Sequence, residues 1–380
     1  MGKQMKLIWL PGWFPSRVDF LPGDYIERHA KAVSEYARVT VVYVVKDPPL
    51  KSGKTEIVKE TIGNLTIYRG YYGAGNKISS AILFYKLLFA VYKLAEREKG
   101  VFDLCHVHVP LKQSLLAIWL KRKGKLNYVV SEHNSWYSSG DFIHQPLLLR
   151  RMVIALYRKA DAVHVVSKSL GMQLQKLIRV VADYTVIPNV VNTDFFKPLE
   201  HKNNTSINFI TISGDIKYKN TGGVIGAFGR LLKAGVNAQL HIAGPHSDEF
   251  KKSGIEERII FYGIVSNQRI AELTQQADAM IFFTRSETFG CVMAESLCCG
   301  VPVIASQIPA LEENLTPNIN ALFVEPDNEE DLLQKLILFI HQKDNFDHRS
   351  IASEAYHKYN YHFVGGQFID FYNIALKKPK

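Results

Sequence analysis

Two glutamates, Glu287 and Glu295, lie on either side of a predicted helix start and carry the most informative chemistry in the sequence. A buried apolar strand is expected to end at Thr284, a short turn carries Glu287, and a helix is expected to begin near Gly290. The backbone N–H groups and the dipole of a helix start favour a diphosphate. A carboxylate accepts hydrogen bonds from a ribose diol. The pattern therefore predicts a nucleoside diphosphate site.

The elements that would position these residues alternate along the chain. Short apolar runs rich in β-branched residues are separated by longer amphipathic segments, a pattern typical of βαβ units and a mostly parallel sheet. The strands expected in the first half are Lys6–Leu10, Val39–Val45, Leu104–Val109, Tyr128–Ser131, Ala162–Val166 and Tyr184–Ile187. The helices expected between several of them are Asp24–Ala37, Ile78–Lys99, Leu111–Lys123 and Lys168–Ile178.

The second half repeats the scheme, with strands expected at Asn208–Ser213, Gln239–Ala243, Ile259–Tyr262, Ala279–Thr284 and Val301–Ala305. Its expected helices are Gly222–Ala234, Ser266–Gln276, Cys291–Cys299 and Glu329–His341. Proline-containing breaks at 187–189 and 195–198 predict one domain over 1–196 and a second over 197–359. A last helix, Phe363–Leu376, is expected to return within 360–380 to the first domain. The predicted fold class is α/β, with two Rossmann-like domains that face each other across a cleft.

Several constrained features around the glutamates occur in one order. Phe289 and Gly290 follow Glu287, Glu295 comes later in the helix, and Gly300-Val301-Pro302-Val303 follows the helix. This arrangement resembles the retaining family-four glycosyltransferases of the GT-B fold. Matching segments extend the resemblance over nearly the whole chain: 166–170, 186–192, 242–244, 260–263 and 320–328. The resemblance implies transfer of a sugar from a nucleoside diphosphate sugar to an acceptor hydroxyl with retention, in cell-surface polysaccharide or glycolipid synthesis.

The resemblance also assigns roles to individual residues. Glu287 would hold hydroxyls of the transferred sugar, Glu295 the ribose and Lys219 the diphosphate, while His133 would contact the sugar from the first domain. The expected catalytic residues are His133, Glu287 and Lys219. The expected donor-binding residues are Gly23, Gly214, Lys217, Lys219, Glu287, Phe289, Gly290, Cys291, Val292 and Glu295.

No cofactor and no metal are expected. The reason is that no DxD-type pair of carboxylates is placed near the predicted diphosphate site. His106 and His108 follow another expected strand, but metal ligation by them is not favoured. The resembled enzymes are thought to react on one face of the sugar, so neither glutamate is assigned as a nucleophile.

One position departs from the family pattern. Asp215 stands where the family commonly has an arginine that binds the diphosphate. Lys217 would be an imperfect replacement, because lysine lacks the bidentate fork of arginine. Two alternatives stay open: a nucleotide-sugar epimerase, which can use the same architecture, and a non-catalytic sugar-nucleotide binding protein, which Asp215 suggests.

The positive charge is concentrated in the first half. Residues 1–200 hold 29 Lys and Arg against 16 Asp and Glu, whereas residues 201–380 hold 17 against 20. No zinc-finger spacing or RNP-like aromatic run predicts nucleic-acid binding. An anionic membrane surface or a phosphate-bearing acceptor explains the charge, and so does a plain solvated basic surface.

The remaining composition bounds the location of the chain. The apolar stretches Ala81–Tyr92 and Leu147–Tyr157 are too short to span a bilayer, and no secretory signal precedes the first strand. We expect a cytoplasmic protein, either free or bound peripherally to the inner face of the membrane. The four cysteines are expected to be buried and reduced.

Overall fold

A computed structural model describes residues 4–73, 75–200, 206–212, 218–245 and 257–377. The chain divides into two compact units, each described by itself. Unit 1 comprises Met1–Val190 and Tyr361–Lys380, and unit 2 comprises Val191–Asn360. The segment after Val190 belongs to unit 2, where the Val191 N–H donates a hydrogen bond to the Tyr359 carbonyl at 2.9 Å.

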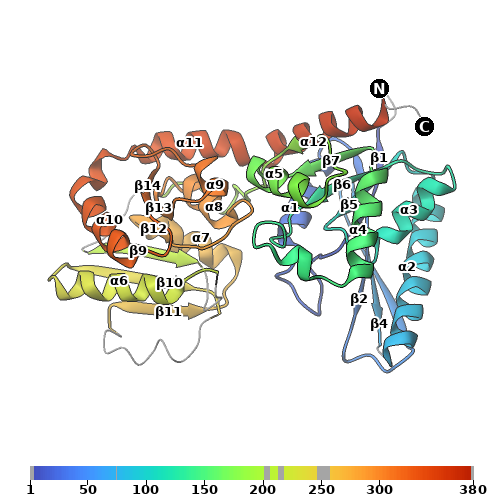
Figure 1. The fold of residues 1–380 in the computed structure, drawn as a ribbon, viewed down its shortest axis with the longest axis horizontal. Coiled ribbons are helices and arrows are strands. Elements are labelled where there is room, and N and C mark those ends of the chain that lie inside the picture. Colours follow the sequence, from blue (N-terminus) through green and yellow to red (C-terminus); the bar gives the residue numbers. More distant parts are fainter. Residues whose placement is uncertain (1–3, 74, 201–205, 213–217, 246–256, 378–380) are drawn as a thin grey trace. The chain divides into compact units, whose positions relative to one another are not determined.

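Unit 1 is built on a sheet with the strand order β3-β4-β2-β1-β5-β6-β7-β8 (Figure 1). The strands are β1 (Lys6–Pro11), β2 (Arg38–Lys46), β3 (Thr55–Ile62), β4 (Leu65–Tyr72), β5 (Leu104–His108), β6 (Tyr128–Glu132), β7 (Ala162–Val165) and β8 (Thr185–Val186). All adjacent pairs are parallel except β3 with β4. The carboxyl ends of the parallel strands therefore share one edge of the sheet, which is where such folds bind ligands.

The helices of unit 1 include one from the far end of the chain. They are α1 (Asp24–Ser34), α2 (Lys77–Lys99), α3 (Ser114–Arg122), η1 (Asp141–His144), α4 (Leu147–Lys159), α5 (Lys168–Leu177) and α12 (Tyr361–Leu376). Phe368 and Tyr372 of α12 are buried in one core cluster with Leu7 and Trp9 of β1. A Cβ on Gly365 would lie 2.4 Å from the Ala32 carbonyl oxygen, so α12 packs against the backbone of α1. The predicted return of the last helix is confirmed.

Unit 2 contains a parallel sheet with the order β11-β10-β9-β12-β13-β14. Its strands are β9 (Ile207–Ile212), β10 (Ala238–Ala243), β11 (Ile259–Gly263), β12 (Ala279–Phe282), β13 (Val303–Ser306) and β14 (Ala321–Val324). Its helices are α6 (Thr221–Lys233), α7 (Asn267–Gln276), α8 (Cys291–Cys298), α9 (Pro309–Glu312), α10 (Glu329–Gln342), η3 (Lys343–Asn345) and α11 (His348–Tyr359). The predicted α/β class with two parallel-sheet units is confirmed.

The clearest difference from the expected elements is the β3–β4 hairpin, which was not predicted. Most of β3 is exposed at the edge of the sheet, including Ile57, Val58 and Ile62, so its pattern carries no buried face. The helices α4 and α11 were also absent from the expected set. The cysteines are free thiols, as predicted. Cys105, Cys298 and Cys299 are buried as expected, whereas Cys291 is half-buried.

Helix α2 is longer than its apolar run suggests. Among the described residues it is the one helix that is long and apolar enough to cross a membrane by length and composition, and one third of its most apolar stretch is buried. The expectation that this region is too short to span a bilayer rested on the apolar run Ala81–Tyr92, which covers only part of α2. One face of α2 is part of the protein core, with Phe84, Leu88 and Val91 buried.

Candidate functional site

The predicted turn and helix of unit 2 form at the carboxyl end of β12. This strand ends at Phe282, and α8 begins at Cys291 with Gly290 as its N-cap. Gly290 has φ 88°, a left-handed conformation that favours glycine, and no side chain among the described residues caps the helix. A Cβ at Gly290 would lie 2.9 Å from Leu311 Cδ2. The backbone conformation therefore favours glycine at this helix start, and a larger residue would displace the end of the Leu311 side chain.

Lys219 and Glu287 meet beside this helix start. The Lys219 Nζ donates a hydrogen bond to Glu287 Oε1, and it lies 5.1 Å from the centre of the Phe282 ring. Both side chains are partly exposed, at 28% for Lys219 and 12% for Glu287. The Tyr218 carbonyl accepts a hydrogen bond from the Thr284 hydroxyl at 2.9 Å, which ties the Lys219 loop to the turn. The sequence placed both residues in the site but did not predict that they pair.

The other predicted residues of α8 differ in exposure. Phe289 is buried, and its ring packs edge-on against Tyr359 with 5.8 Å between centroids, so only its backbone is available to a ligand. Cys291 and Val292, in the first turn, are half-buried. Glu295, in the second turn, is 6% exposed. The three remaining positions of this region, Gly214, Asp215 and Lys217, lie outside the described residues.

Gly23 occupies the equivalent place in unit 1, as the N-cap of α1. Its φ is 79°, and no described side chain caps the helix. A Cβ at Gly23 would lie 2.5 Å from the carbonyl atoms of Trp13 and 2.8 Å from the Phe14 nitrogen. The loop after β1 thus folds directly against the start of α1, and only glycine permits this approach.

His133 follows the last residue of β6, and a buried carboxylate holds its backbone. Glu132 Oε1 accepts hydrogen bonds from the N–H groups of His133, at 2.9 Å, and Asn134, at 2.8 Å. The Tyr157 hydroxyl donates to Glu132 Oε2 at 2.6 Å. Burial raises the pKa of Glu132, against the effect of these hydrogen bonds. This network fixes the position of the His133 backbone.

The His133 ring lies among other aromatic rings rather than in solvent. It is 7% exposed, its centroid is 4.8 Å from that of Tyr25, and its Nε2 is 3.5 Å from His108 Nδ1. Burial, followed by the neighbouring histidines His29 and His164, lowers the pKa of His133 well below 6.5. The ring is therefore a neutral hydrogen-bonding group at pH 7.

The sequence did not single out His29 and His164 as neighbours of His133. His29 lies on α1 between the buried residues Ile26 and Ala30. The apolar spacing around it was a signal that this histidine points into the core. His164 lies inside β7, and no motif marks it.

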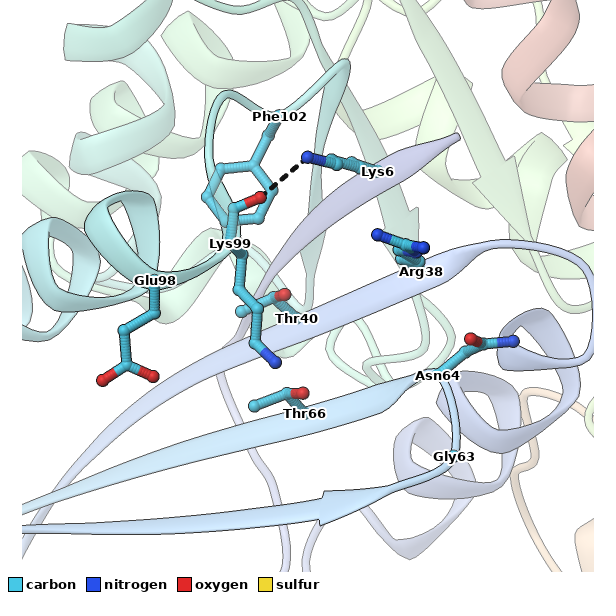
Figure 2. Close-up of a pocket in the computed structure, with 9 residues that line it drawn as sticks. All are labelled: Lys6, Arg38, Thr40, Gly63, Asn64, Thr66, Glu98, Lys99 and Phe102. Atoms are coloured by element: carbon cyan, nitrogen blue, oxygen red, sulfur yellow. Dashed lines mark hydrogen bonds between the residues drawn. The ribbon is translucent and has the colours of Figure 1, made fainter. Parts of the chain in front are cut away.

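A separate pocket lies at the amino-terminal ends of the unit 1 strands, opposite to their carboxyl ends. It has a volume of about 370 Å³, and Lys6, Arg38 and Lys99 bring basic groups to it (Figure 2). Lys6 and Arg38 stand at the amino ends of β1 and β2, and Lys6 Nζ donates to the Lys99 carbonyl at 2.8 Å. The pocket is thus distinct from the carboxyl-end residues predicted from the sequence.

Comparisons with known proteins agree with this architecture. Residues 25–195 match the model "Glycosyltransferase Family 4", and residues 192–358 match "Glycosyl transferases group 1". The chain is 24% identical over 309 residues to N-acetyl-alpha-D-glucosaminyl L-malate synthase of Bacillus anthracis, covering 76% of this chain and 78% of the relative. It is also 24% identical over 275 residues to alpha-monoglucosyldiacylglycerol synthase of Streptococcus pneumoniae, covering 62% of each chain and thus less than two thirds of that relative.

A solved structure extends the likeness to the whole fold. The crystal structure of Anabaena HepE in complex with UDP and glucose matches with a TM-score of 0.70 and 16% identity, covering 97% of this chain and 100% of that one. At this identity the likeness concerns the fold. Two family models that together span residues 25–358, and a two-unit parallel-sheet architecture, lead to one assignment. The chain belongs to the glycosyltransferases with a family 4 amino-terminal domain and a group 1 carboxyl-terminal domain, in the GT-B fold.

Proposed function

We propose that this glycosyltransferase moves a sugar from a nucleoside diphosphate sugar to an acceptor hydroxyl with retention of anomeric configuration. The observation that carries the proposal is the Lys219–Glu287 pair beside the uncapped start of α8. The bond between the sugar and the diphosphate breaks, and a bond from the same carbon to the acceptor oxygen forms. The acceptor proton passes to the departing phosphate.

In unit 2, the helix start and Lys219 supply positive potential for the leaving diphosphate. The charge on this group grows as the bond breaks, so donors aimed at it stabilise the transition state more than the ground state. Glu287 holds sugar hydroxyls and simultaneously orients Lys219. Glu295, with little exposed surface, accepts hydrogen bonds from the ribose diol.

In unit 1, His133 contacts the transferred sugar as a neutral imidazole. Its low pKa follows from burial, so it donates or accepts a hydrogen bond without adding charge. Gly23 permits close approach of the loop after β1 to the substrate. Metal-independent chemistry is part of the proposal, because lysine and a helix terminus supply the electrostatic stabilisation that a cation gives elsewhere.

We also propose a glycolipid or lipid-linked acceptor, with the protein bound at the cytoplasmic face of a membrane. Helix α2 exposes Ile78 (74%), Ile82 (51%), Tyr85 (38%) and Phe89 (40%), at spacings that place them on one helix face. An apolar groove of about 520 Å³ continues this face, lined by Tyr85, Leu88, Phe89, Leu115, Leu116 and Trp119. Unlike a membrane-spanning helix, α2 buries its other face in the core.

The charge around this apolar face favours anionic lipid. Between residues 77 and 95 the helix carries Lys77, Lys86 and Lys93 and no acidic residue, and Glu96 in the last turns pairs with Lys93 at 2.6 Å and with Lys125 at 4.0 Å. The exposed end of α3 and the turn after it add Arg122, Lys123 and Lys125. An apolar face with basic residues binds at the headgroup boundary through apolar burial and attraction to anionic lipid. The Streptococcus pneumoniae relative, by its name, makes a glycolipid.

A panel of UDP-, GDP-, ADP- and dTDP-sugars tests the transferase proposal. We expect one class to raise the unfolding temperature, and to release free nucleoside diphosphate in proportion to the glycosylated acceptor. Binding without turnover would indicate a sugar-nucleotide binding protein. Conversion of the donor without an acceptor would indicate an epimerase.

Vesicle co-sedimentation tests the membrane proposal. The wild type should bind phosphatidylglycerol-containing vesicles in a salt-sensitive manner, and the double variant Ile78→Ser/Ile82→Ser should bind roughly 10-fold more weakly. Ile319→Ser, at a 55% exposed position in unit 2, is the matched control. Equal binding by all three proteins would remove the α2 face from the proposal.

A further inference from the structure

Five buried histidines gather at the carboxyl end of the unit 1 sheet, and their hydrogen bonds divide them into two groups. They are His29, His106, His108, His133 and His164. Two of them, His106 and His164, have both ring nitrogens bonded. In the other three, at least three of the six ring nitrogens have no partner among the described residues. The two groups therefore have different chemical capacities, although all five rings are buried.

The bonded group forms a chain with one defined direction. His164 Nε2 lies 2.9 Å from the Ile187 carbonyl, which only accepts, so this nitrogen carries a proton. For the neutral ring, Nδ1 then accepts from the Ser131 hydroxyl at 2.6 Å. That hydroxyl accepts in turn from His106 Nε2 at 2.6 Å, and His106 Nδ1 accepts from the Tyr372 hydroxyl at 2.7 Å. These two histidines are saturated structural residues.

The second group consists of His29, His108 and His133, which we call the histidine triad. Nε2 of His108 and Nδ1 of His133 have no hydrogen-bond partner among the described residues. The His29 ring lies beside the Pro188 carbonyl, whose interaction opposes the lowering of the His29 pKa by burial. The other two nitrogens, His108 Nδ1 and His133 Nε2, face each other at 3.5 Å, beyond the usual length of a hydrogen bond. The facing pair is too far apart for a good hydrogen bond, so these two nitrogens, with one from His29, can be offered to a ligand.

The spacing of the triad suits a small cation. One nitrogen from each ring can be chosen so that all three lie within 4.8 Å of one another. In an equilateral triangle of this size, the centre lies about 2.8 Å from each nitrogen, and zinc–nitrogen bonds are about 2.0–2.1 Å. To reach the roughly 3.4 Å between ligands of a tetrahedral zinc ion, each nitrogen would need to move inward by about 0.8 Å at most. The facing nitrogens, His108 Nδ1 and His133 Nε2, are 3.5 Å apart, close to the roughly 3.4 Å between two ligands of a tetrahedral zinc ion.

The protonation state of the triad is the one that a metal requires. Burial lowers the pKa of His29, His108 and His133 well below 6.5, so all three are neutral at pH 7 and no proton needs to leave. The nearby Arg28, which also lowers the pKa of His29, is paired with Asp24 at 3.0 Å. The structure thus presents three neutral nitrogen ligands with fixed surroundings.

We propose that the triad binds a divalent transition metal of the zinc class, with a fourth position open to water or an anion. Three histidines with one open position are a known zinc arrangement. His133 then serves as a metal ligand and no longer contacts the sugar, so the metal inhibits transfer. This second part rests on the function proposed above for His133.

Direct metal binding to the full chain tests the site. After treatment with a chelator and its removal, the wild type should bind one equivalent of Zn²⁺ in competition with a chromophoric chelator. With Co²⁺ it should show the intense visible absorption of a four-coordinate ion. His29→Gln and His108→Gln should each weaken zinc binding by about 100-fold or more. His106→Gln, on the same strand as His108 but from the bonded group, should leave the affinity within about 3-fold.

Two results would overturn the metal site: absence of stoichiometric Zn²⁺ and Co²⁺ binding to the wild type, or binding that survives both triad variants. The wild-type measurement tests the metal site even if a variant fails to fold. Far-UV circular dichroism identifies such a variant. Zinc should lower transfer while leaving nucleotide affinity unchanged. Zinc binding by a protein without transferase activity would refute the proposed function but retain the metal site.

Discussion

The two units use the same backbone device at the predicted site and surround it with opposite chemistry. Gly23 starts α1 in unit 1 and Gly290 starts α8 in unit 2, both in the left-handed conformation and without a described capping side chain. Beyond Gly23 lie neutral buried histidines. Beyond Gly290 lies the partly exposed Lys219–Glu287 ion pair. In both units the helix start after a parallel strand therefore forms the backbone of the predicted site. The side chains around it determine which chemical groups can bind there.

The difference follows from burial. In unit 1, burial keeps imidazoles neutral, so this side contributes shape and hydrogen bonds. In unit 2, a lysine and a glutamate form a partly exposed ion pair beside the positive end of the helix dipole. A charged diphosphate is thus expected at unit 2, and the less charged sugar and acceptor at unit 1.

The largest expected effect is the loss of unit 1 stability in acid. The folded-state pKa of His164 is about 4, below its ordinary 6.5, so the unfolded chain binds more protons between these values. Stability is fully present above pH 6.5 and falls as the pH drops toward 4, by about 3 kcal/mol from His164 alone. The four other histidines, with pKa values lowered well below 6.5, act in the same direction.

Urea unfolding followed by tryptophan fluorescence measures this effect. All four tryptophans, Trp9, Trp13, Trp119 and Trp136, belong to unit 1, so the signal reports that unit. His164→Asn should reduce the pH dependence. An unfolding free energy that stays constant between pH 6.5 and 4.5 would show that the histidines are not held neutral.

Alanine at the two N-cap glycines compares the helix starts directly. Gly23→Ala should lower the free energy of unfolding by about 3 kcal/mol or more, because a left-handed backbone strain is added to overlap with the Trp13 backbone. Gly290→Ala should cost about 1–2 kcal/mol, since it meets flexible side-chain ends of Leu311 and Phe282. Tryptophan fluorescence reports the first variant and hydrogen exchange of unit 2 peptides the second.

Gly53→Ala is the matched control for these glycines. Its φ is 80°, and a Cβ there would have no neighbour within 4 Å, so it measures backbone strain without overlap. Equal losses for Gly23→Ala and Gly53→Ala would mean that the loop after β1 yields easily.

Removal of the Lys219 charge tests the chemistry of unit 2. Lys219→Met should lower kcat/KM by about 100-fold, because the leaving diphosphate loses one cationic donor in the transition state. The measurement is nucleoside diphosphate release in the presence of an acceptor. Lys233→Met, at the exposed end of α6, is the control and should be silent. Wild-type turnover by Lys219→Met would show that Lys219 only orients Glu287.

The smallest effect concerns the ribose. Glu295→Ala should raise the Kd of the nucleoside diphosphate by about 10-fold, as expected for the loss of hydrogen bonds to a charged acceptor. A 2′-deoxy analogue should bind more weakly than the ribonucleotide to the wild type, yet equally to Glu295→Ala. Glu272→Ala, on the exposed face of α7, is the control. A full 2′-deoxy penalty in Glu295→Ala would remove Glu295 from the ribose assignment.

Local patterns were sufficient for much of the fold. The alternation of apolar runs and amphipathic segments predicted most strands and helices to within a few residues, because buried strands and half-buried helices have distinct periods. The β3–β4 hairpin was not predicted, because β3 has almost no buried face and so lacks the alternation of apolar and polar residues that indicates a strand. The helix start at Gly290 was predictable because a strand end, a turn and a glycine lie close together in the sequence.

The sequence by itself determined the α/β class, the family resemblance, the position of Glu287 and Glu295 at the junction of β12 and α8, and the position of Lys219 just before α6. Only the tertiary structure decided that Lys219 pairs with Glu287, and that His29 of α1 joins His108 of β5 and His133 after β6. The physical reason is that parallel strands adjacent in the sheet are joined by long crossovers. Side chains far apart in the sequence therefore meet at the carboxyl ends of the strands. Hydrophobic periodicity is a local property of the sequence and cannot predict such contacts.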